Sequence, residues 1–245
     1  MICTSGIGFD PLVEGQRLRF AFHGIWQGVA VLADRPGGSL WFHLTGEAFA
    51  GPRAGTRLRR LDSGRHTTWD EWRRTHPDTR VLAVDPRWVG RPGDQGYFGR
   101  DGVRRGDPFL PEAFRATLQA TDARLPLHEL VYGAVVEGQA VAWRVADVTA
   151  RGLQHLVVAG VPIVLWGDPV SGSVAAFDRR VDGVTLQFAL GPEGRVTDDE
   201  GASRWNREGV ATDGPRAGQR LVPLVGLQAE WYGWFAHHPD TRLLR

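Results

Sequence analysis

The sequence predicts a mainly β protein of the α+β class, built as a tandem duplication of one β-rich unit with one short helix in each copy. The chain has 245 residues, of which 32 are Gly and ten are Trp. This composition favours short strands and tight turns over helical bundles. Apolar and polar residues alternate in several short segments, and a unit near the start recurs near the end in the same order. A recurrence kept over so many positions is not produced by chance.

The repeat appears in several pairs of matching segments. The offset, which is the difference in residue number between matching positions, decreases by a few residues along the chain. FDPLVEGQRLRF, from Phe9, is matched by FDRRVDGVTLQF, from Phe177, and the offset is 177 − 9 = 168. Gly-Pro-Arg-Ala-Gly occurs at 51–55 and at 214–218. W-x-x-W-x-x-x-H-P-D-T-R closes both copies. We expect the shared residues to be structural: Trp41, Trp69, Trp72 and His76 in the first copy, and Trp205, Trp231, Trp234 and His238 in the second.

Each copy is expected to contain strands followed by one helix. Leu18, Phe20 and Phe22 alternate with less apolar residues, as in a half-buried strand, and residues 186–190 repeat the pattern. A second hairpin is predicted to turn at residues 36–38. Thr68 and Glu71 then fit a capping box that begins the helix, and proline at position 77 ends it. Residues 79–83 are predicted to form a closing strand.

The predicted organisation is a first unit over 1–83, a Gly/Pro/Arg-rich connector over 84–128 and a second unit over 129–245. Residues 131–136 and 139–145 flank Glu137-Gly138, which predicts a hairpin. This hairpin has no counterpart in the first unit, because 169 − 168 = 1 already reaches Met1. We expect the two units to pack with approximate two-fold symmetry and the first unit to expose a sheet edge.

Composition also excludes several classes of function. The net charge of +1 gives no electrostatic footprint for nucleic acid. All 29 basic residues are Arg, so no Schiff-base lysine or phosphate-loop lysine exists. A single cysteine, Cys3, rules out an intramolecular disulfide. No apolar run approaches the ~20 residues of a transmembrane helix, and no signal peptide begins the chain, which is expected to be soluble as written. A small-molecule or protein partner stays open.

Several motifs together resemble a prokaryotic family catalogued as domain of unknown function 3179. They are SGIGFDP at 5–11, GSLWFHLTGEAFAGPRAGTRL at 38–58, TTWDEWRRTHPDT at 67–79, VAGVPIVLWGDPVSGSVAAFDRRVDG at 158–183 and GPRAGQRL at 214–221. The resemblance covers nearly the whole chain apart from the loosest part of the connector. It implies tandem β-rich repeats and an exported or envelope-associated parent protein, and it brings no established biochemical role.

The resemblance also bears on the N-terminus. Family members resembling this chain carry a Cys-x-x-Cys just before the Ser/Thr-Gly-x-x-Phe-Asp segment. Cys3 matches the second of these cysteines, and the first would fall immediately before Met1. Together with the repeat arithmetic, this leads us to expect an N-terminally truncated chain.

Residues found in only one copy are better functional candidates than shared residues. His43 is replaced by Arg207 in the second copy, Glu47 by Val210, and His23 by Gly191, while Cys3 falls near Ser171 and Gly172. Thiolate and imidazole groups suit copper or zinc, and a nearby His would make the thiol more reactive. In a strand, His43 and Thr45 would point to one face. The sequence therefore predicts a redox or metal site at Cys3, His43, His23 and Glu47, although nothing in it requires a metal. The alternative is a buried free Cys with His43 hydrogen-bonded inside a β unit.

Two other functions stay open. A ligand-binding module would use exposed Trp and Arg side chains towards glycans or carboxylates, with Trp26, Trp88, Trp143 and His66 as candidates. A scaffold or interaction protein would have no site of its own. Hydrolase, metalloprotease and phosphate-loop motifs do not occur in the sequence, so whether the protein is an enzyme stays open.

Overall fold

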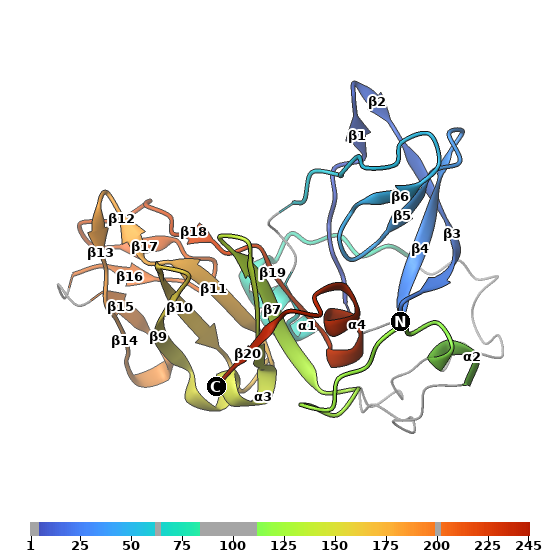
Figure 1. Cartoon of the computed structure of the whole chain (residues 1–245). Coiled ribbons are helices and arrows are strands. Elements are labelled where there is room, and N and C mark those ends of the chain that lie inside the picture. Colours follow the sequence, from blue (N-terminus) through green and yellow to red (C-terminus); the bar gives the residue numbers. More distant parts are fainter. Residues whose placement is uncertain (1–4, 62–64, 84–111, 199–201) are drawn as a thin grey trace.

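A computed structural model describes residues 5–61, 65–83, 112–198 and 202–245. Its elements are mainly strands, which confirms the predicted β-rich class. In Figure 1 the blue strands of the first unit stand apart from the gold and orange strands of the second, and the red helix α4 lies between the two groups.

The first unit has a small hairpin and one four-stranded antiparallel sheet. The sheet order is β3-β4-β5-β6, and the turn between β4 and β5 falls at residues 36–38 as predicted. The elements are β1 (Leu12–Val13), β2 (Gln16–Arg17), β3 (Arg19–Trp26), β4 (Val29–Arg35), β5 (Leu40–Phe42), β6 (Ala48–Ala50) and α1 (Trp69–Thr75). A short helix, α2 (Glu112–Arg115), precedes the second unit.

Besides the four-stranded sheet β14-β15-β16-β17, the second unit has two additional four-stranded sheets. Their orders are β19-β7-β8-β20 and β18-β11-β10-β9. The elements are β7 (Leu130–Val136), β8 (Gln139–Arg144), α3 (Val145–Arg151), β9 (Leu153–Val158), β10 (Val161–Gly167), β11 (Val174–Asp178), β12 (Arg180–Val181), β13 (Val184–Thr185), β14 (Phe188–Leu190), η2 (Pro192–Gly194), β15 (Val196–Asp198), β16 (Arg204–Trp205), β17 (Ala211–Asp213), β18 (Val222–Pro223), β19 (Gly226–Glu230), α4 (Trp231–His237) and β20 (Arg242–Leu244).

One set of polar contacts occurs in both sheets. In the first unit the buried Asp34 carboxylate accepts from the Ser39 backbone N–H at 3.1 Å and from the Trp41 indole N–H at 3.0 Å. Arg53 lies 3.3 Å from the same carboxylate. The second unit repeats these contacts at 3.1, 3.2 and 3.5 Å, between Asp198 and Ser203, Trp205 and Arg216.

Glycine at the start of each Gly-Pro-Arg-Ala-Gly string has a steric reason. Gly51 and Gly214 have φ values of +89° and +87°. A Cβ atom on Gly51 would lie 2.7 Å from the Ser39 Cα, and one on Gly214 would lie 1.9 Å from the Ala202 carbonyl oxygen. Only glycine therefore allows the string to pass this close to the Asp-Ser turn.

The helix segments also share their internal contacts. The Trp72 indole donates to Thr79 Oγ1 at 2.9 Å and stacks on His76 with 4.0 Å between ring centroids. Trp234 makes the same 2.9 Å bond to Thr241 and lies 4.0 Å from the ring of His238. The structural role expected for these residues stays a prediction.

Three local predictions were wrong. Residues 79–83 form no strand in the structure, whereas their counterpart β20 pairs with β8. Residues 43–45 form a turn after β5, so the strand alternation expected for His43 and Thr45 does not apply. The second unit contains α3 in addition to α4, because Val145 and Val148 pack their side chains into a core that the first unit does not have.

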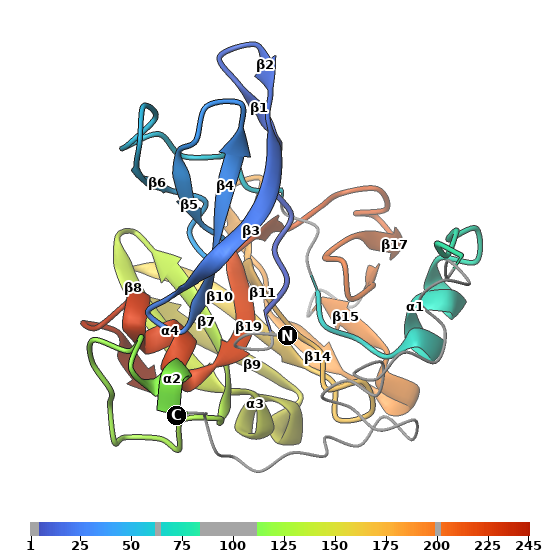
Figure 2. The same cartoon turned by 90° about the vertical axis from the view of Figure 1, so that its right-hand side faces the viewer.

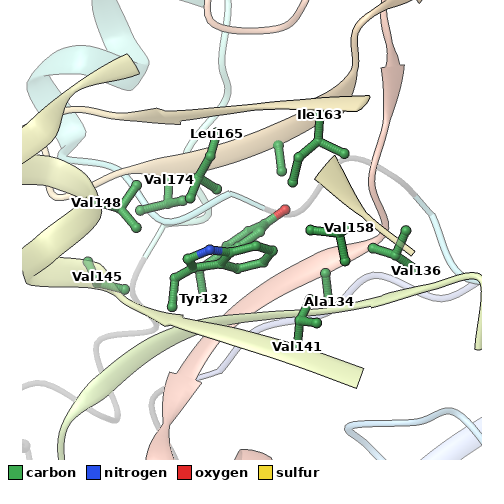
Figure 3. Close-up of a cluster of buried hydrophobic side chains, with 12 residues drawn as sticks. Tyr132, Ala134, Val136, Val141, Val145, Val148, Val158, Ile163, Leu165 and Val174 are labelled. Carbon is green, nitrogen blue, oxygen red and sulfur yellow. The ribbon is translucent and has the colours of Figure 1, made fainter. Parts of the chain in front are cut away.

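The core of the second unit lies between its two additional sheets. Figure 3 shows Tyr132, Ala134 and Val141 from β7 and β8 facing Ile163, Leu165 and Val174 from β10 and β11. A separate apolar cluster joins the two units, since Val29 and Leu44 pack with residues of α4, β7 and β19. Burial in this cluster fixes the units against each other.

Candidate functional site

A cavity of about 610 Å³ lies between the two units. Its walls come from segments far apart in the sequence: residues 7–8, 60–61, 65, 72 and 76 from the first unit, and 132, 174–177, 207–208, 220–221 and 223–226 from the second. The volume lies within the range of ligand-binding pockets in proteins, which is roughly 300–1,000 Å³.

One wall of the cavity is strongly cationic. Arg60, Arg65, Arg207 and Arg220 line it, and Glu208 is the only acidic residue among the lining residues that the structure describes. The formal charge of the lining is therefore 4 − 1 = +3 with His76 neutral. An excess of this size favours an anionic ligand.

The four arginines differ in how far their charge is already compensated. Arg207 lies 3.1 Å from Asp168, and Arg60 donates to the Gly226 carbonyl. Arg65 is half-buried and donates to the Arg207 carbonyl at 3.4 Å, and no carboxylate of the described part of the chain lies within ion-pair distance of it. Burial lowers the pKa of the Arg65 guanidinium, which the Glu208 charge opposes only in part. A cation in this state gains from an incoming anion.

The remaining walls are apolar and aromatic. Trp72 from α1, Tyr132 from β7 and Phe177 from β11 face the cavity together with Leu61 and Leu221. Burial raises the pKa of the Tyr132 hydroxyl, so it is neutral throughout the physiological range. His76 and Glu208 lie 3.3 Å apart at the edge, and this pair joins α1 to the second unit.

The residues predicted to hold a metal have different environments and different partners in the structure. His43 is half-buried, with Nδ1 3.2 Å from the Ala30 carbonyl oxygen and Nε2 3.0 Å from Ser5 Oγ. His23 is exposed on β3, and Glu47 is paired with Arg57. Within residues 5–61, 65–83, 112–198 and 202–245, no three His, Cys, Asp or Glu side chains gather as metal ligands. Cys3 lies outside the described residues, so its place beside His43 stays a prediction.

Of the residues predicted to bind a ligand, the three that the structure describes do not line the cavity. Trp26 is 44% exposed at the end of β3, whereas Trp143 is 2% exposed within the second core. Trp88 lies outside the described residues. His66 directly follows Arg65, and burial lowers its pKa, but it does not line the cavity. The arginines that do line it were missed from the sequence.

The comparison of the two copies carried a signal for three of these arginines, whereas Arg220 matches Arg57 and is shared by both copies. Arg65 corresponds to Leu227, since 65 + 162 = 227, and Arg60 corresponds to Pro223, since 60 + 163 = 223. Both arginines are therefore specific to the first copy, as the predicted metal residues are. Arg207, the counterpart of His43, is specific to the second copy and lines the cavity.

A histidine that the sequence did not single out lies at the contact between the units. The His237 ring in α4 lies 5.0 Å from the ring of Phe42. Burial, together with the neighbouring His238 and His43, lowers the pKa of His237 to about 4. His237 is therefore neutral at pH 7 and belongs to the contact between α4 and the first unit.

Comparisons with known proteins place the chain in one family. A family model described as "Protein of unknown function (DUF3179)" matches residues 1–241, which confirms the resemblance seen in the sequence. No curated protein and no solved structure matches the chain. Among the residues that the structure describes, no helix has the length and apolar character needed to cross a membrane.

Proposed function

Because the chain belongs to the DUF3179 family, whose description gives no activity, we propose a function from the geometry of the cavity: binding of a small apolar carboxylic acid between the two units. The observation that carries the proposal is Arg65, a half-buried guanidinium among the four arginines that line the cavity, whose remaining lining is largely apolar. This is the ligand-binding alternative, with Trp72 and cavity arginines in place of the predicted Trp26, Trp88, Trp143 and His66.

The charge of the site supports an acid over a neutral ligand. Arg65 and Arg220 line the cavity, and neither lies within ion-pair distance of a carboxylate in the described part of the chain. A guanidinium binds a carboxylate with two parallel hydrogen bonds, which are stronger than those to a neutral acceptor. Desolvation of Arg65 strengthens such a pair.

The apolar walls support a ligand with a hydrocarbon body. Trp72, Leu61 and Val225 offer partly exposed surface that gains from covering by alkyl or aromatic groups, at roughly 25 cal/mol per Å² of apolar area. A strongly hydrated anion such as free phosphate would leave this surface uncovered. A medium-chain fatty acid or an aromatic acid matches both kinds of wall.

We also propose that the two units arose by tandem duplication and pack with approximate two-fold symmetry. The repeated Asp-Ser-Trp-Arg contacts support the duplication. Reciprocal contacts support the symmetry, since His237 of the second unit contacts Phe42 of the first, and His76 of the first contacts Glu208 of the second. The cavity then lies between corresponding segments, residues 7–8 and 175–176.

Isothermal titration calorimetry with octanoate tests the proposed function, and 1-octanol serves as the uncharged ligand of equal chain length. We expect octanoate to bind and octanol to bind at least about tenfold more weakly. Arg65→Gln should weaken octanoate binding about tenfold or more, because one charge-assisted pair contributes about 1.5–3 kcal/mol.

Arg73→Gln is the matched control, since Arg73 lies on α1 with a side chain 66% exposed and does not line the cavity. Its octanoate affinity should equal that of the unsubstituted protein. Equal affinities of the Arg65 and Arg73 variants, or equal affinities for octanoate and octanol, would overturn the proposal.

A further inference from the structure

Two of the half-buried arginines of the cavity contact different elements of the second unit. Arg65 donates to the Arg207 carbonyl, which lies in the turn between β16 and β17. Arg60 donates to the carbonyl of Gly226, the first residue of β19. Strands β17 and β19 belong to different sheets, and Figure 2 shows them apart. The two guanidinium groups therefore lie at different parts of the cavity wall.

The charges and dipoles around the two arginines differ in the same way. The charges that act on Arg65 include those of Glu208 and Arg207, which belong to the turn after β16. Burial raises the pKa of the Tyr132 hydroxyl, and the positive charge of Arg60 opposes this rise. Tyr132 is on β7, which pairs with β19. Arg60 thus belongs to the β7–β19 side of the cavity, and Arg65 to the side of the turn.

The charge around the cavity is larger than one carboxylate neutralises. The lining residues give +3 when His76 is neutral. Asp168, which lies 3.1 Å from Arg207, lowers this charge to 3 − 1 = +2. A ligand with one carboxylate would leave an excess of +1 in the site, whereas a ligand with two carboxylates matches the charge.

Apolar side chains lie beside both arginines. Leu61 directly follows Arg60, is 36% exposed and lines the cavity. Val225 directly precedes Gly226, is 45% exposed and also lines the cavity. These side chains gain from contact with a hydrocarbon chain, which a compact dianion such as phosphate or oxalate does not offer.

We propose that the ligand of the cavity is an α,ω-dicarboxylate, a hydrocarbon chain with a carboxylate at each end. One carboxylate binds Arg65, the other binds Arg60, and the chain covers Leu61 and Val225. Arg60 keeps its partners within the protein, among them the Gly226 carbonyl, because a guanidinium presents five N–H donors. The proposal rests on the proposed function and makes it more specific: Arg60 determines the preference for a second carboxylate.

Isothermal titration calorimetry at pH 7 compares octanedioate with octanoate, which has the same number of carbon atoms. Both carboxyl groups of octanedioate are ionised at this pH, since carboxyl groups titrate near about pH 4. We expect octanedioate to bind at least about tenfold more tightly than octanoate, because it forms a second charge-assisted pair. Monomethyl octanedioate, in which one end is an uncharged ester, should bind no more tightly than octanoate.

Variants of Arg60 assign the second carboxylate. Arg60→Gln should weaken octanedioate binding about tenfold and leave octanoate binding unchanged, so that the preference is lost. Arg60→Lys keeps the positive charge, so octanedioate should remain the tighter ligand. Arg59→Gln is the matched control, because the Arg59 side chain is 70% exposed, pairs with Asp10 and does not line the cavity. It should bind both acids as the unsubstituted protein does.

The outcomes separate this inference from the proposed function. Octanoate binding as tight as octanedioate binding in the unsubstituted protein would overturn the dicarboxylate and leave the proposed function in place. A preference for octanedioate that persists in Arg60→Gln would overturn the role of Arg60. Failure of both acids to bind would overturn the proposed function and this inference together. The comparison of the two acids in the unsubstituted protein does not depend on the folding of any variant.

Discussion

At the scale of single residues, the buried aspartates determine how each small sheet closes. Asp34 and Asp198 each accept hydrogen bonds from a serine backbone N–H and a tryptophan indole, and each faces an arginine. The sequence identified Trp41 and Trp205 as shared scaffold but not these aspartates, because nothing in a linear pattern shows that an indole and a carboxylate seven residues apart will meet.

Asp34→Ala and Asp198→Ala should each lower the free energy of unfolding by about 3 kcal/mol. Each leaves an indole N–H, a backbone N–H and an arginine without their buried acceptor. Urea denaturation measures this loss. Asp70→Ala is the control, because the Asp70 side chain is 90% exposed, and its cost should stay below about 1 kcal/mol. If Asp34→Ala and Asp198→Ala both lower the free energy of unfolding no more than Asp70→Ala does, the stabilising role of the two buried aspartates is contradicted.

The same motif predicts loss of stability in acid. Burial alone would raise the pKa of Asp198, but the Ser203 and Ala202 backbone N–H groups, the Trp205 indole and Arg216 together hold it below its ordinary value. The contribution of the Asp198 carboxylate to the free energy of unfolding is therefore complete above the pKa of about 3.9 that the group has in the unfolded chain. It is lost as pH falls through the lower pKa that the group has in the folded protein. Asp198→Asn should flatten the fall in unfolding free energy below about pH 4, and an unchanged pH profile would count against it.

His237 gives a separate pH dependence at higher pH. Its pKa is about 4 in the folded protein because of burial, and about 6.5 in an unfolded chain. As pH is lowered, the unfolded state therefore binds a proton at His237 before the folded state does. The free energy of unfolding is highest above pH 6.5 and decreases between pH 6.5 and 4. His237→Phe should reduce this fall without abolishing it, since burial also lowers the pKa of His238 to about 4 and lowers the pKa of His43 and His66.

Urea denaturation at several pH values tests this prediction. His23→Phe serves as the control, because His23 is exposed on β3. That variant should keep the pH profile of the unsubstituted protein. An equal profile for His237→Phe would show that burial of this ring does not control stability.

At the scale of elements, two helices that share the motif W-x-x-W-x-x-x-H-P have different environments. The motif W-x-x-W-x-x-x-H-P predicted both helices, and the Thr68 hydroxyl accepts from the Glu71 backbone N–H at 3.3 Å as the capping pattern requires. Helix α1 buries no residue while α4 buries five, Trp231 to Phe235, and the sequence agrees with this difference, since α1 has charged residues between its tryptophans where α4 has Tyr and Gly. Burial depends on strands β7 and β19 elsewhere in the chain.

Trp231→Ala and Trp69→Ala measure this difference directly. Trp231 is fully buried, so its loss should cost about 3–5 kcal/mol of unfolding free energy. Trp69 is 50% exposed at the corresponding position, and its loss should cost less than about 1 kcal/mol. Thermal and urea unfolding of both variants supply the comparison. Similar costs would show that α1 is covered as α4 is.

At the scale of the whole molecule, the sequence predicted the hairpins and the β-rich class but not the cavity. Hairpins follow from alternation and turn residues that are local in the chain. The cavity instead needs Arg65, Tyr132 and Arg207 from three distant segments, and it exists only because the units pack through α4. The sequence shows that residues 60 and 65 differ between the copies, but it does not show that both residues line the same cavity.

The claim that the cavity binds an apolar carboxylate through Arg65 is tested most directly by nuclear magnetic resonance. Octanoate is titrated into ¹⁵N-labelled protein while the indole N–H signals of its ten tryptophans are followed, with Trp72→Phe assigning the Trp72 signal. Trp72 lines the cavity, so its signal should shift in a saturable manner, while that of the exposed Trp26 stays in place. Arg65→Gln should suppress the shift. A Trp72 signal that does not move with octanoate, or that moves equally in the Arg65 variant, would contradict the claim.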